Sequence, residues 1–308
     1  MMSAWLWAVF TVIAAFAQTV RNAMQRELTG SLGTVGATHV RFLFGFPFAL
    51  LFLVALLSMT GTVLPLPGLK FWPWVIAGAF TQIAATALML AAMAEGSFVV
   101  TIAYTKTEPI QVAIFGLIFL GDAVSLPMMI AILVATAGVI VMSIPRAAPS
   151  RKRGRQGRGI FGGIRPTLLG LASGGMLALA VIGFRGAILS LGLPNYVMAA
   201  TFTLVIGLAM QAVTFSLYLW LRQPDVMFAL FRDWKPSLFA GFMGALASQF
   251  WFLAFALTSA ASVRTLALVE VLFAQFLARF SFGQRTTARE AIGMVLVVAG
   301  VVLLILAH

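Results

Sequence analysis

The chain consists of apolar runs of about 20 residues, each long enough to cross a bilayer as a helix. Short segments rich in proline, glycine or charge separate the runs, such as residues 64–68 (LPLPG) and 192–195 (GLPN). Since backbone polar groups in lipid must bond within the segment, the pattern predicts an all-α integral membrane protein. The ten predicted transmembrane helices are residues 4–24, 36–58, 72–93, 97–120, 124–144, 167–190, 195–220, 236–257, 260–282 and 288–307.

One segment interrupts this pattern. Residues 146–166 carry seven Lys or Arg, no acid and several glycines, which is typical of a solvated linker. The linker divides the chain into residues 1–145 and 167–308, each with five predicted spans. We expect two five-helix repeats, since sliding the chain by 162 residues places EPIQVAIFGLIFLGD (108–122) on EVLFAQFLARFSFGQ (270–284).

An odd number of spans in each repeat has a geometric consequence. The second copy must enter the membrane from the opposite side, so the repeats are expected to be inverted. This is a common plan among secondary transporters, whose substrate binds near the midplane between the repeats. The sequence therefore predicts two inverted five-helix repeats around a central cavity.

Composition supports a multi-pass membrane protein, because 62% of residues are hydrophobic and only 9% are charged. The net charge of +12 comes mostly from short loops, so it indicates topology rather than a nucleic-acid partner. The positive-inside rule predicts a cytoplasmic linker and termini on the opposite side. No cysteine is present, and no motif suggests a cofactor or metal site. With His39 and His308 as the only histidines and no hydrolase motif, an enzyme is not favoured.

The fourth predicted span contains charge where the solvent is hydrocarbon. Lys106 and Glu108 are followed by Pro109, which removes a backbone donor and predicts a hinge at 107–109. A charged side chain at the bilayer centre costs at least about 2.5 kcal/mol, so both are expected to face a watery cavity. The alternative is an ion pair that holds two helices together.

Other polar residues extend this candidate site. Glu270 in the ninth span occupies the place that Glu108 has in the first repeat, and Arg264 lies six residues earlier. Arg185 in the sixth span is a further candidate. Trp251 lies mid-span, where it could stack on a ligand. The uncharged candidates are Gln82, Tyr104, Gln249 and His39.

With these features, the chain resembles the drug/metabolite transporter superfamily. The residues that carry the resemblance are EPIQVAIFGLIFLGD (108–122) and ATAGVIVM (135–142), and they are similar to EamA-type ten-helix exporters. The second copy departs from the pattern, because Val271 replaces the proline and Gln284 the acid. The overall likeness is greatest to the YddG-type exporters of aromatic amino acids. It implies a basket of helices around a central cavity in the bacterial inner membrane, and a small-molecule substrate.

The resulting hypothesis is export of an amino acid or related small metabolite by alternating access. Lys106 or an arginine would meet the carboxylate, and Glu108 or Glu270 the ammonium group. Trp251 and Tyr104 would accept the side chain. A carboxylate in a low dielectric binds protons more readily, so proton coupling and facilitated diffusion both remain open. The alternative function is a multidrug exporter for hydrophobic cations.

Overall fold

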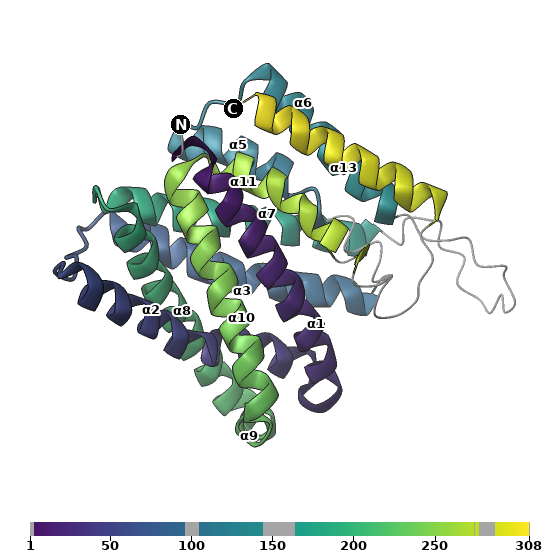
Figure 1. Ribbon diagram of the computed structural model, residues 1–308. Coiled ribbons are helices and arrows are strands. Elements are labelled where there is room, and N and C mark those ends of the chain that lie inside the picture. Colours follow the sequence, from purple (N-terminus) through teal and green to yellow (C-terminus); the bar gives the residue numbers. More distant parts are fainter. Residues whose placement is uncertain (1–2, 96–104, 144–163, 274, 277–286, 308) are drawn as a thin grey trace, which may run out of the picture.

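The computed structural model describes residues 3–95, 105–143, 164–273, 275–276 and 287–307, and these residues are almost entirely helical (Figure 1). Within these residues, eight helical stretches are long and apolar enough to cross a membrane, and each coincides with a predicted span. The elements are α1 (Ser3–Leu43), α2 (Gly45–Thr60), α3 (Phe71–Glu95), α5 (Glu108–Leu120), α6 (Leu126–Ser143), α7 (Ile164–Ser190), α8 (Tyr196–Arg222), α9 (Pro224–Arg232), α10 (Trp234–Leu257), α11 (Ala260–Leu266), η1 (Ala267–Val269) and α13 (Ala288–Leu306).

Helix ends follow local chemistry. The Asn195 side chain accepts hydrogen bonds from the first turn of α8, and Thr287 forms a capping box with Glu290 at the start of α13. Gly61 and Gly121 end α2 and α5 in the left-handed conformation, which glycine adopts without strain. These caps fix where the chain turns at the ends of the spans.

The first two predicted spans differ from the structure at their junction. The expected connection at residues 25–35 is helical, and α1 continues to Leu43 with one break at Gly33 (φ 66°). A second break follows at Phe44, before α2. The segment has no proline to stop a helix, so a single glycine provides the turn. A short helix, α9, also forms where the sequence predicted only a turn, with Pro224 in its first turn.

The fourth and ninth predicted spans are broken helices in the described residues. Helix α5 begins at Glu108 with Pro109 in its first turn, so the predicted interruption at 107–109 coincides with a helix start. In the ninth predicted span, helix α11 is followed by the 3₁₀ turn η1, which ends just before Glu270. The charged residues of both spans therefore lie next to helix ends rather than within regular helix.

Helices from the two sides of the linker interleave. The most extensive packing joins α3 with α7, α1 with α10, and α6 with α13. Glycines permit close approach at two of these interfaces: a Cβ added at Gly183 would lie 2.6 Å from the nitrogen of Gly78, and one at Gly138 would lie 2.7 Å from the oxygen of Gly293. The start of α1 and the end of α13 lie on the same side of the molecule (Figure 1).

Candidate substrate site

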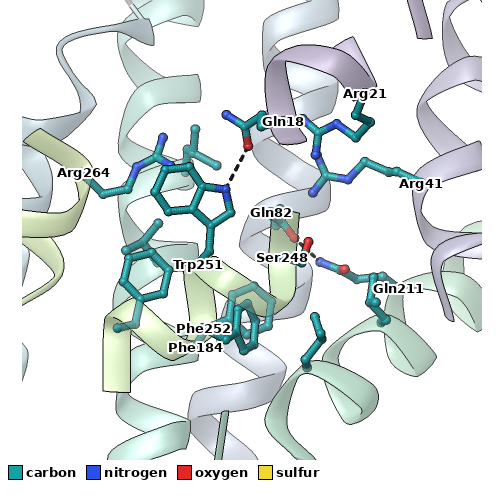
Figure 2. A pocket seen from close by; sticks show the side chains of 15 residues that line it. Gln18, Arg21, Arg41, Gln82, Phe184, Gln211, Ser248, Trp251, Phe252 and Arg264 are labelled. Carbon is teal, nitrogen blue, oxygen red and sulfur yellow. Dashed lines mark hydrogen bonds between the residues drawn. The ribbon is translucent and has the colours of Figure 1, made fainter. Parts of the chain in front are cut away.

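A pocket of about 150 Å³ lies among helices drawn from both sides of the linker (Figure 2). Helices α1, α3, α7, α8, α10 and α11 all contribute to it. Its polar lining residues are Gln18, Arg21, Arg41, Gln82, Gln211, Ser248 and Arg264, and its apolar ones are Leu177, Val181, Phe184, Leu204, Leu208, Trp251, Phe252 and Phe255. The volume is below the roughly 300–1,000 Å³ of pockets that bind drug-sized ligands, so it suits a small solute.

Two ion pairs connect the broken spans beside this pocket. Arg264 donates to Glu108 Oε2 at 2.6 Å, and the ammonium of Lys106 pairs with Glu270 Oε1. Glu108 is only 3% exposed, and its other carboxylate oxygen has no hydrogen-bond partner. Since Glu108 lies in the first turn of α5, the positive end of that helix also stabilises its charge. The structure thus pairs each acid of one span with a cation of the other.

Trp251 links the pocket wall to one of these pairs. Its indole N–H donates to Gln18 Oε1 at 3.1 Å, and the Gln18 amide donates to Glu270 Oε2 at 2.6 Å. The Arg264 guanidinium lies over the Trp251 ring, 5.1 Å from its centroid. Trp251 also stacks on Phe255 at 6.3 Å between centroids. The ring is therefore held in a fixed orientation at the edge of the pocket.

The two glutamine candidates, Gln82 and Gln249, differ in whether they line the pocket. Gln82 lines the pocket and accepts a hydrogen bond from the Gln211 amide at 2.6 Å. Gln249 donates to the Thr201 hydroxyl at 2.9 Å and is not among the lining residues. Its amide oxygen is buried without a partner. Of the two, only Gln82 can contact a solute in this conformation.

Two further candidates lie away from the pocket. Arg185 donates one hydrogen bond to each oxygen of the Asp122 carboxylate, both at 3.0 Å. It also donates to the backbone carbonyls of Phe255 and Thr258. His39 bonds the Ser216 hydroxyl at 2.8 Å through Nε2. Neither lines the pocket, so the structure does not bring them into the site with Trp251 and Arg264.

Tyr104 lies outside the described residues, so the structure does not place this candidate.

Metal binding has no support in the part of the chain that the structure describes, because no three His, Asp or Glu side chains gather there. The lining residues of the pocket offer a solute charge, hydrogen bonds and aromatic surface.

The sequence reasoning did not select Arg21 and Arg41, which both line the pocket. The signal was present, since both fall inside the predicted spans 4–24 and 36–58, where a charged residue needs an explanation as Lys106 does. Gln211 and Ser248 were also missed, because uncharged polar residues are common at membrane helix contacts. The pocket is consequently more cationic than the sequence suggested.

Residues 5–144 match the EamA-like transporter family. This similarity covers less than half of the chain and favours a membrane transporter of small molecules over an enzyme. No curated protein matches the chain. A solved structure described as "Crystal structure of protein" superposes with a TM-score of 0.73 over 98% of this chain and 95% of that chain, at 14% identity, which shows a shared fold.

Proposed function

We propose that the chain is a secondary transporter that moves small carboxylate-bearing metabolites, amino acids among them, out across the bacterial inner membrane by alternating access. The observation that carries the proposal is the pocket among helices of both halves, where arginines and aromatic rings meet. Such a lining fits a solute with an anionic head and an apolar body. The EamA-like match over residues 5–144 supports the transporter class.

We also propose that residues 1–145 and 167–308 are two inverted repeats joined by a cytoplasmic linker at 146–166. The pairing of helices supports the two-fold relation between the halves. If α1, α2, α3, α5 and α6 correspond to α7, α8, α10, α11 and α13, exchanging the halves turns the α1–α10 contact into the α7–α3 contact. The contacts α2–α8, α5–α11 and α6–α13 each map onto themselves. This is the pattern that a pseudo-two-fold axis between the halves requires, and an odd number of spans in each repeat would place that axis in the membrane plane.

In the proposed mechanism the two halves rock about the pocket. The ion pairs Lys106–Glu270 and Glu108–Arg264 both connect the halves, so rocking must alter at least one of them. A substrate carboxylate offers Arg264 a replacement partner, and the ring of Trp251 offers the apolar body a surface. Export of aromatic amino acids, as in the YddG-type exporters, is one case of this mechanism.

Export of hydrophobic cations, the alternative, has less support. Among the described lining residues of the pocket there are three arginines and no carboxylate. A cation would be repelled there, because like charges at short range in a low dielectric cost free energy. The nearby acids Glu108 and Glu270 are already paired with Arg264 and Lys106.

The test is counterflow of labelled phenylalanine and 3-phenyllactate with purified protein in liposomes. We expect wild-type protein to exchange at least one of them above empty liposomes. Lys106→Met and Glu108→Gln should each be slower by about tenfold or more, since a charge-assisted hydrogen bond is worth about 1.5–3 kcal/mol. Arg232→Gln is the matched control, because that arginine is 77% exposed beside Asp233. Wild-type rates in both test variants would remove these residues from the mechanism.

A further inference from the structure

The charges around the pocket do not balance. Four cations lie in or beside it, and two of them, Lys106 and Arg264, are paired with Glu270 and Glu108. Arg21 and Arg41, which also line the pocket, form no ion pair with any acid whose side chain the structure describes. Two positive charges are therefore left without a counterion among the described side chains.

Of these two cations, Arg21 has the stronger need for a counterion, because it is buried. It is only 7% exposed, it donates to Asn22 Oδ1 at 2.8 Å, and its Nε is buried without a partner. A guanidinium does not lose its proton in proteins, so it cannot escape burial by becoming neutral. Burying such a charge without an opposite one is costly, which favours binding of an anion at this position.

The fold brings Arg21 and Arg41 much closer together than they would lie in one straight helix. Twenty residues of straight helix would separate them by about 30 Å. The break at Gly33 turns α1 back on itself, and the Gln25 amide accordingly reaches the carbonyl of Ala37 at 2.8 Å.

Both arginines then pack on the same glycine of α10. A Cβ added at Gly244 would lie 3.3 Å from Arg21 Cδ and 3.5 Å from Arg41 Cβ. Arg41 also lies over the ring of Phe42, 4.6 Å from its centroid. The absence of a side chain at Gly244 leaves room for two guanidinium groups to face one pocket.

The other end of the pocket is aromatic. Phe184 and Phe252 lie 4.9 Å apart between ring centroids, and Figure 2 shows them toward the end away from Arg21. Trp251 forms the wall between the two ends (Figure 2). The pocket is therefore amphipathic along its length, with a cationic head site and an apolar body site.

We propose that this pocket binds a net-anionic organic acid, whose carboxylate is held by Arg21 and Arg41 and whose aromatic or branched apolar body lies against Trp251, Phe184 and Phe252. The inference rests on the proposed function and names the substrate class. An α-ammonium group has no unpaired carboxylate among the described lining residues, and it would lie near arginines. Aryl hydroxy acids, oxo acids and N-acylated amino acids fit the charges better than free amino acids do.

The experiment uses three probes with the same phenyl body and different heads: 3-phenyllactate (anion), phenylalanine (zwitterion) and phenethylamine (cation). Binding to the purified full chain in detergent is measured by calorimetry, and counterflow in liposomes is measured in parallel. We expect phenyllactate to bind about tenfold or more tightly than phenylalanine, as the loss of one charge repulsion or charge-assisted bond implies. Phenethylamine should neither bind nor compete.

Variants then assign the head site. Arg21→Gln and Arg41→Gln should each weaken phenyllactate binding by about ten- to hundredfold, while Arg232→Gln leaves it unchanged. The comparison of probes on wild-type protein needs no variant, so it decides the question even if an arginine variant does not fold. Equal or tighter binding of phenylalanine would overturn the inference and leave the transport function standing. If neither phenylalanine nor phenyllactate binds or moves, the proposed function itself fails.

Discussion

Arg185 forms a clamp of four hydrogen bonds, and this clamp is expected to contribute strongly to the stability of the fold. Its guanidinium binds Asp122 through two 3.0 Å bonds and also donates to two carbonyls at the end of α10, those of Phe255 and Thr258. One side chain thus ties α7 to α10 and to the turn after α5. Replacing Arg185 with Met removes all four bonds and leaves the Asp122 charge, only 16% exposed, without a partner. Breaking a buried pair in this way costs about 3–5 kcal/mol.

The measurement is unfolding of purified protein in detergent micelles as sodium dodecyl sulfate is added, followed by circular dichroism. We expect Arg185→Met to unfold at markedly lower denaturant than wild type. The double variant Arg185→Met/Asp122→Leu should recover part of the loss, because it no longer leaves an unpaired charge. Lys70→Met, at an exposed position outside the helices, should stay within about 0.5 kcal/mol of wild type. If Arg185→Met is as stable as wild type and only loses transport, the clamp reasoning is wrong and Arg185 acts on the substrate.

Three further predictions concern the pocket and its frame. Trp251→Phe keeps a ring but removes the indole N–H that bonds α1, so ligand binding measured by calorimetry should weaken several-fold, and Trp251→Ala should weaken it more. Gly293→Leu should destabilise the α6–α13 pair by about 1–3 kcal/mol in the same denaturant titration, since even a Cβ would lie 2.6 Å from the carbonyl oxygen of Gly138. Lys106→Met leaves Glu270 short of its cation, and adding Glu270→Gln should restore stability relative to the single variant; an additive loss would show that the two do not interact.

The spans were predictable because a membrane imposes a strict rule on each one. About 20 apolar residues with internally bonded backbone are needed for every crossing, and eight of the expected runs coincide with long helices. Where the chain leaves the lipid this rule no longer acts. Residues 25–35 therefore continued as helix, and residues 224–232 formed α9, although the sequence suggested loops. Local turn chemistry decided these segments.

The site was predictable to the extent that charge in a span requires a partner. This rule selected Lys106, Glu108, Arg264 and Glu270, which the structure brings into two ion pairs. It could not say which acid meets which cation, because the pairs join residues more than 150 positions apart.

Arg21 and Arg41 satisfy the same rule but lie near the ends of their predicted spans, where arginine often reaches the interface. Only the turn at Gly33 brings them into one pocket. Arg185 shows the reverse case: the sequence assigned it to the cavity, but the structure pairs it with Asp122 instead. Tertiary contacts, rather than the sequence position of a charge, decided which arginines face the pocket.

The ion pair of Glu108 with Arg264 suggests how binding and opening are linked. A ligand shifts a conformational equilibrium only by the difference in its affinity for the two states. If the halves separate at this pair, Arg264 loses its counterion. An anionic substrate held by Arg21 and Arg41 in the same pocket lowers the cost of that state, because it replaces Glu108 as the nearby negative charge. Glu108→Gln keeps the shape and removes the competing charge. We therefore expect this variant to bind 3-phenyllactate more tightly than wild type in calorimetry, yet to exchange it more slowly in counterflow. Weaker binding together with slower exchange would mean that Glu108 contacts the substrate directly, and that the competition for Arg264 is not what couples the two events.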